Sequence, residues 1–180
     1  MLSITTPLIE LYDPVSETFT EYKPVNLELE HSLVAISKWE SKWMKPFLSN
    51  DNKTDDQIYD YILCMITNRS DIDIQLIKSI PQKLIDNITS YIQSPMTATT
   101  INQGNSKSSR EIITSELIYY WMISFNVPFE CQYWHLNRLL MLINVCNIKN
   151  SPPKKASANE IMSRNRALNA ARKKALNTSG

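Results

Sequence analysis

Glycine is nearly missing from this chain, and that scarcity limits the folds open to it. The 180 residues include two glycines, Gly104 and Gly180, where an average protein has about 7%. Phosphate-cradling loops and tight hairpin turns both depend on glycine. A Walker loop and a dinucleotide-binding fingerprint are therefore excluded. A parallel α/β enzyme is disfavoured, because helices tolerate the lack of glycine best.

The remaining composition fits a globular protein built mainly of helices. Hydrophobic residues make up 43% and charged residues 21%, as in ordinary soluble domains. We predict a mainly α, helical bundle-like single domain with three parts: an N-terminal β-hairpin or arm (1–30), a helical core (31–150) and a mobile, basic, partly helical tail (151–180). We expect no signal peptide. The longest apolar stretch, "LLMLINVC", is too short to span a bilayer.

The first thirty residues have the composition of a hairpin. Residues 2–12 and 18–29 are rich in β-branched and aromatic side chains, and turn-forming residues separate them. Pro7 and Pro24 favour edge strands, because proline cannot donate a ladder hydrogen bond.

Helical periodicity begins after His31. An apolar stripe runs from Leu33 through Trp43 to Phe47 and predicts a helix that Pro46 ends. Thr54 is a predicted N-cap, and acidic residues in the first turn suit the helix dipole. Residues 71–80 and 81–94 predict two shorter helices, with Pro81 at a first helical position.

Two strongly apolar segments follow a polar loop at 95–110. Residues 109–126 predict one helix, with Ser109 as its cap, and residues 129–150 predict a second. Because each is apolar over more than half its circumference, we expect them to be the most buried pair. Trp121 and Trp134 are then expected in the core.

Charge is divided unevenly along the chain. From Lys149 onward there are eight basic residues and one acidic residue, a net charge of +7, and the other 11 basic and 17 acidic residues give −6. Ser157 and Glu160 have the spacing of a capping box, and the residues after them favour helix. Five of these charges are candidate partner-binding residues: Arg164, Arg166, Arg172, Lys173 and Lys174.

That basic segment leaves three interpretations open. It can be a solvated tail, it can reach an acidic surface of another copy or of a partner protein, or it can bind nucleic acid. The segment has no aromatic residue to stack on bases, so nucleic acid is the least favoured partner.

Cysteine and histidine residues suggest no catalytic or metal site. Cys64, Cys131 and Cys146 are widely spaced, which favours a reducing compartment and buried thiols. Cys131 and His135 are four residues apart and could share a helix face, but a zinc site needs two more ligands. We expect both to be structural, and we predict neither enzymatic activity nor a cofactor.

Trp39 and Trp43 are the candidate binding aromatics. They share the apolar stripe, so both can belong to the core. With Lys38, Lys42 and Lys45 they can instead form an exposed groove wall, since tryptophan is enriched in binding hot spots. We expect Trp43 to seal the interior and Trp39 to lie closer to a partner.

Several stretches together resemble a family of tailed-bacteriophage proteins. They are "LELEHSLVAISKWESKWMKPFL", "SPMTAT", "REIITSELIYYWMISFNVPFECQYWHLNRLLMLINVCNIKN" and "SRNRALNAARKKALNTSG", and they are similar to proteins labelled tail assembly chaperones. The resemblance implies a non-catalytic helper in the host cytoplasm that binds the tape-measure protein and tail-tube subunits. A structural virion protein of the tail or head–tail junction is the alternative, and a nucleic-acid-binding accessory protein is the second. Self-association also remains possible on this interpretation.

Overall fold

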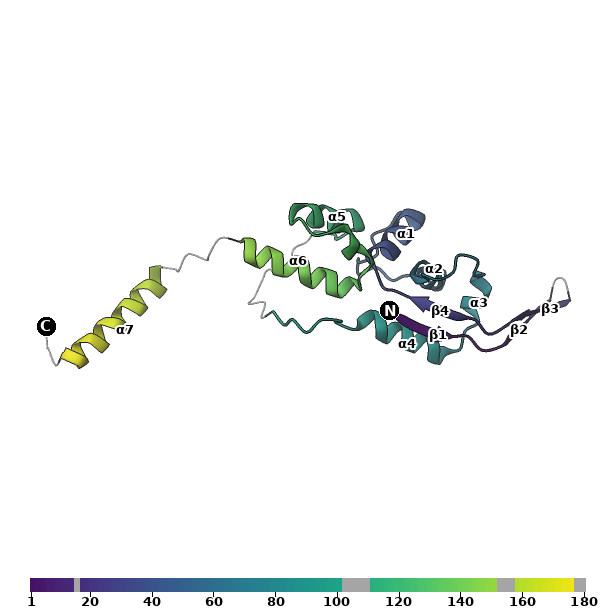
Figure 1. The fold of residues 1–180 in the computed structure, drawn as a ribbon, viewed down its shortest axis with the longest axis horizontal. Coiled ribbons are helices and arrows are strands. Elements are labelled where there is room, and N and C mark those ends of the chain that lie inside the picture. The colour runs from purple at the N-terminus through teal and green to yellow at the C-terminus, as the bar shows by residue number, and fades with distance from the viewer. Residues whose placement is uncertain (15–16, 102–110, 152–157, 177–180) are drawn as a thin grey trace. The chain divides into compact units, whose positions relative to one another are not determined.

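The computed structural model describes residues 1–14, 17–101, 111–151 and 158–176. It contains two compact units, Met1–Asn147 and Ile148–Gly180, which are described separately. The described chain is mainly α with short antiparallel strands (Figure 1). Its elements are β1 (Leu2–Thr5), β2 (Ile9–Asp13), β3 (Thr18–Tyr22), β4 (Asn26–Leu29), α1 (Leu33–Trp43), α2 (Asp55–Met65), α3 (Ile74–Lys78), α4 (Gln82–Gln93), α5 (Ser115–Ser124), the 3₁₀ helix η1 (Phe129–Tyr133), α6 (Leu136–Asn150) and α7 (Ala158–Leu176).

The N-terminal strands form one long hairpin with a gap in its middle. β1 pairs with β4 and β2 pairs with β3 in the same antiparallel register, since Leu2 lies opposite Leu29 and Ile9 lies opposite Tyr22. The same register places Pro7 opposite Pro24, and neither can donate to the ladder. The predicted hairpin is therefore confirmed, and its two prolines explain why it consists of two ladders.

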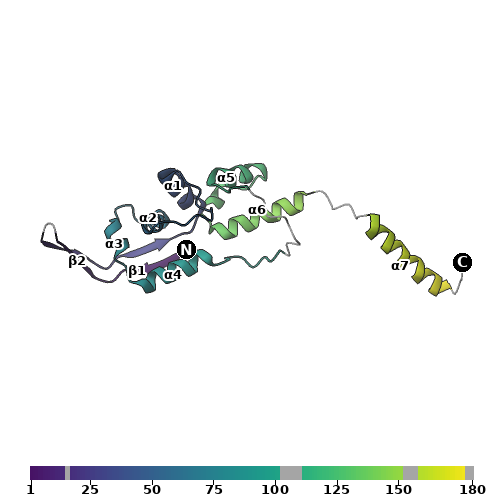
Figure 2. The ribbon, with the colours of Figure 1, turned by 180° about the vertical axis from the view of Figure 1, so that it is seen from behind.

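The inner half of the hairpin belongs to the core, whereas the outer half extends beyond it. Leu27 and Leu29 of β4 are fully buried together with the helical core residues. β4 also contacts α2, and α4 lies along β1 (Figure 2). In Figure 1, β2 and β3 continue past β1 and β4, away from α5 and α6.

Helix α1 is deeply buried in the core of Met1–Asn147. Its residues Leu33 and Ile36 have no exposed surface, and it packs against α2, α5 and η1. Ser32 caps it by accepting a hydrogen bond from the Ala35 amide. The prediction that 109–126 and 129–150 would be the most buried pair is wrong, because α5 exposes Tyr120 and several residues of α6 are half-buried.

Local capping signals placed one helix start correctly and another within one residue. Thr54 is the N-cap of α2, and Gln57 completes a capping box there. α4 begins at Gln82, so Pro81 is its N-cap, one position earlier than predicted. Ser109 lies outside the described residues. α5 starts at Ser115, so the helix predicted from 109 begins later than expected.

The predicted helix 129–150 is also divided. Residues 129–133 form η1, and Trp134 is extended, with φ −72° and ψ 161°. The amide of Leu136 donates to the carbonyl of His31 at 2.6 Å, and Ser32 and His135 form an isolated β-bridge. Pairing with the chain before α1 therefore interrupts the helix.

The second unit consists of the end of α6 and α7. The described side chains of α7 are exposed along its whole length, and the capping box predicted for Ser157 and Glu160 depends on atoms outside the described part of the chain. No helix in the described ranges is long and apolar enough to cross a bilayer.

Candidate partner-binding surface

Trp39 is a core residue. Its side chain is 1% exposed, and its indole N–H donates to the backbone carbonyl of Gln57 at 2.8 Å. The ring of Phe47 packs edge-on against it, with centroids 5.1 Å apart. The hydrogen bond joins α1 to the first turn of α2, so Trp39 fixes the packing of these two helices.

Trp43 is closer to the surface than Trp39, which reverses the expectation for this pair. It is the last residue of α1 and is half-buried. Its buried Nε1 atom has no hydrogen-bond partner among the described residues. The Nζ atom of Lys42 lies 5.9 Å from its ring centroid.

The two candidate lysines have different environments. Lys42 forms an ion pair of 2.6 Å with Asp60, whose side chain is buried. The buried carboxylate therefore compensates much of the charge on Lys42. Lys38 is exposed on the same helix. The structure thus does not combine Lys38, Trp39, Lys42 and Trp43 into one open groove wall.

The basic candidates Arg164, Arg166, Arg172, Lys173 and Lys174 all lie on α7 and are exposed. Every candidate on α7 is therefore open to a partner.

A group of exposed apolar side chains lies on α5 and η1. Tyr120 and Ile123 are 62% and 61% exposed, and Phe129 and Tyr133 are 53% and 63% exposed. Half-buried Tyr119 connects the two pairs, since its ring centroid is 6.5 Å from that of Phe129. We call these five residues the α5–η1 surface. Exposed aromatic clusters of this kind mark interaction sites.

The buried carboxylate of Glu40 positions α5. One oxygen accepts from the amide of Ser115 and the other from the amide of Phe47, each at 2.7 Å. A carboxylate at a helix N-terminus satisfies a free amide and suits the helix dipole. Since Ile118 and Met122 fill the inner face of α5, Tyr120 and Ile123 are turned outward.

A hollow of about 390 Å³ lies beside the start of α5. It is lined by residues 48–51 and 111–113, and it includes the exposed side chain of Ile112. Its lining is mixed, so it offers a shallow recess rather than an enclosed ligand site.

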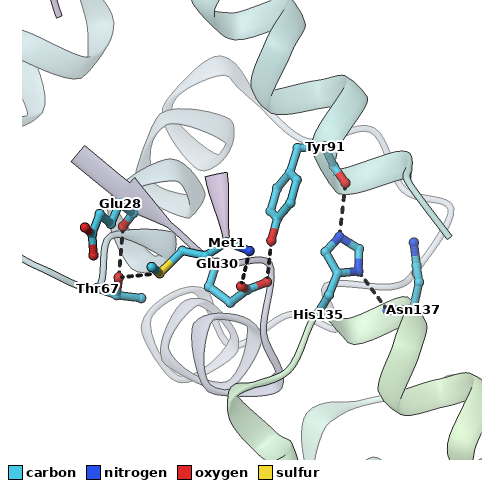
Figure 3. Close-up of polar contacts among 7 residues, drawn as sticks. All are labelled: Met1, Glu28, Glu30, Thr67, Tyr91, His135 and Asn137. Atoms are coloured by element: carbon cyan, nitrogen blue, oxygen red, sulfur yellow. Dashed lines mark hydrogen bonds and ion pairs between the residues drawn. The ribbon is translucent and has the colours of Figure 1, made fainter. Parts of the chain in front are cut away.

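Two buried histidines meet where β4, α4 and α6 converge. The rings of His31 and His135 are 5.0 Å apart. The Nε2 atom of His135 donates to the carbonyl of Tyr91 at 3.0 Å, and Nδ1 accepts from the amide of Asn137 at 3.3 Å (Figure 3). The phenol of Tyr91 donates to Glu30 at 2.6 Å, and the amino group of Met1 pairs with the same carboxylate at 3.0 Å (Figure 3).

Burial favours the neutral form of both histidines. Burial, together with the nearby His135, lowers the pKa of His31 to about 4. Burial also lowers the pKa of His135, and this outweighs the raising effect of its bond to the carbonyl of Tyr91. Both ring nitrogens of His135 have partners within the chain, which gives this histidine a structural role.

The histidine–thiol pair considered from the sequence is not assembled. Cys131 lies in η1 and His135 lies beyond the extended Trp134, so they do not share a helix face. Burial raises the pKa of the Cys131 thiol, which disfavours the thiolate. Within the described ranges, no group of three histidine, cysteine or acidic side chains could hold a metal ion.

The α5–η1 surface was missed because its residues were assigned to the core. One signal was present in the sequence: "LIYYWMI" has no charged residue, and a helix packed on one side cannot bury every position.

Comparisons with protein-family models, curated proteins and solved structures found no match to this chain.

Proposed function

We propose that this protein is a non-catalytic tail assembly chaperone of a tailed bacteriophage. In this proposal it binds the tape-measure protein and tail-tube subunits in the host cytoplasm during tail assembly. The resemblance of its sequence supplies the identity of the partners. The observation that carries the binding role is the α5–η1 surface, where four large apolar side chains are more than half exposed.

The chemistry of this surface suits an apolar helical segment. Tyrosine and phenylalanine provide large rigid contact area at low entropic cost. An amphipathic helix presents apolar side chains about one turn apart, and Tyr120 and Ile123 are themselves one turn apart on α5. A tape-measure helix that has not yet been enclosed by tail-tube subunits exposes such a stripe.

The proposal extends to the finer features of the fold. It takes the helices of Met1–Asn147 as a bundle-like body that presents the surface, and it takes the basic C-terminal segment as mobile. Charges on such a segment make binding sensitive to salt, and this sensitivity helps release when tail-tube subunits arrive.

Co-expression with the tape-measure protein, followed by copurification, tests the proposal. We expect a complex with the wild-type chain and at least a tenfold weaker one with Tyr120→Ala/Ile123→Ala, since removing a binding hot spot costs about 1–2 kcal/mol or more. Leu8→Ala/Ile58→Ala is the matched control, because both side chains are exposed elsewhere. If wild type forms no complex, the chaperone proposal is wrong. If both double variants bind equally well, the α5–η1 surface is not the binding site.

Two further measurements separate the alternatives. A chaperone is expected to be absent from purified phage particles, whereas a virion protein of the tail or head–tail junction is present in them. A nucleic-acid-binding protein would bind duplex DNA with a steep salt dependence and would lose this binding when the exposed arginines of α7 are replaced.

A further inference from the structure

The two faces of the β2–β3 ladder differ sharply. Ile9, Leu11 and Tyr22 are half-buried on one face, and the phenol of Tyr22 donates to Asp73 at the start of α3 at 2.7 Å. Because side chains alternate along a strand, the residues between them point the other way. Those residues form the outer hairpin face: Glu10, Tyr12, Phe19 and Glu21, all exposed.

Aromatic rings form the middle of the outer hairpin face. Tyr12 lies directly opposite Phe19 in the ladder, and their ring centroids are 5.0 Å apart. They are nevertheless 53% and 72% exposed. This cross-strand pair stabilises the ladder, and its exposed faces also leave aromatic surface open to a partner.

The acidic residues beside the aromatic pair indicate that the partner carries positive charge. Glu10 lies directly opposite Glu21, and like charges at opposed positions destabilise a ladder. Neither carboxylate has an ion pair or hydrogen bond with another residue in the described ranges. A guanidinium group suits both the unpaired glutamates and the exposed aromatic rings, since it pairs with carboxylates and stacks on aromatic rings.

Helix α7 has the matching chemistry and spacing. Arg164, Leu168 and Arg172 follow each other at intervals of four residues and are exposed, so they share one face. Each interval spans about 6 Å along a helix axis. The two-residue step from Glu10 to Tyr12 spans about 7 Å along a strand. An arginine of α7 can therefore meet the glutamate pair while Leu168 covers the aromatic pair.

We propose that the outer hairpin face binds α7 of a second copy of this chain, and so drives self-association. The interaction uses residues outside the α5–η1 surface and does not depend on the chaperone proposal. Mutual exchange of α7 between two copies would give a closed dimer. Since its contacts are mainly exposed ion pairs, association should weaken as salt is added.

Sedimentation of the full chain tests the proposal through a charge swap. We expect wild type to associate at low salt with rising concentration. Glu10→Lys/Glu21→Lys and, separately, Arg164→Glu/Arg172→Glu should each weaken association about tenfold or more. The variant that combines all four changes should recover it, because the charges are complementary again.

Two controls keep the result interpretable. Asp51→Lys/Asp86→Lys changes the net charge equally at exposed positions outside the hairpin, and it should leave association unchanged. Circular dichroism of each variant checks that the fold is retained, and Glu10→Gln/Glu21→Gln replaces any lysine variant that does not fold. A wild-type chain that stays monomeric at high concentration and low salt overturns the proposal. Association that is lost on the α7 changes but retained on the hairpin changes also overturns it.

Discussion

Stability should fall as the pH is lowered from 7.5 to 5, and His31 should account for much of this loss. The side chain is 3% exposed, and its pKa is lowered to about 4 from 6.5. Above pH 6.5 the histidine is neutral in both states, so it imposes no penalty. Between pH 6.5 and 4 the unfolded chain binds a proton that the folded chain does not, which favours unfolding. These two pKa values give a loss of about 2 kcal/mol at pH 5.

The contacts of His31 suggest which substitution tests this prediction. Its Nδ1 atom is paired with the phenol of Tyr61, and His135 faces its ring. His31→Asn places an amide group near the position of Nδ1 and does not titrate. We therefore expect the variant to have a free energy of unfolding that falls about 2 kcal/mol less than that of wild type over this pH range.

Urea unfolding followed by circular dichroism at pH 7.5, 6.5, 5.5 and 5.0 measures this effect. His135→Asn should also flatten the profile, because the pKa of His135 is lowered as well. The range ends at pH 5 so that carboxylates with lowered pKa values, such as Asp73 and Glu116, stay ionised. If His31→Asn and wild type lose stability in parallel, His31 is not held neutral by burial and the reasoning is wrong.

Two further predictions concern α1. Glu40→Gln exchanges one acceptor oxygen for an NH₂ group and leaves an amide such as that of Ser115 without an acceptor, so the free energy of unfolding should fall by about 2–4 kcal/mol. A loss below about 0.5 kcal/mol in a urea titration would contradict this role. Trp39→Phe removes the bond to Gln57 and should cost about 2–3 kcal/mol, whereas Trp43→Phe should change stability by less than about 0.5 kcal/mol. Similar losses for the two tryptophan variants would show that the difference in their burial has no energetic consequence.

Local chemistry made several elements predictable from sequence. The cap at Thr54 depends on a side chain three residues from its target, so the sequence contains the whole interaction. The strands β2 and β3 follow from composition over short windows. The prolines at positions 7 and 24 interrupt the ladder because they lack an N–H, although their alignment appears only once the register is known.

Contacts between distant segments could not be predicted in the same way. Helical periodicity predicts correctly that Trp39 and Trp43 lie on the same side of α1. It does not predict how deeply each side chain is buried. Trp43 is the last residue of the helix, where fewer neighbours surround it. The break before α6 arises because residues 31 and 32 pair with 135 and 136, and no pattern within 129–150 shows that partner.

The outer side of α5 can stay exposed because contacts at the two ends and on the inner face of this helix hold it in place. Glu40 fixes its first amide, and the amide of Val127 donates to the carbonyl of Met122 at 2.8 Å just beyond its end. Between these points, one inner face is buried in the core. The helix is thus secured at both ends and on one side, so Tyr120 and Ile123 can remain apolar without taking part in folding. Since burial in the core does not require these side chains, they remain available for the partner contact that we propose.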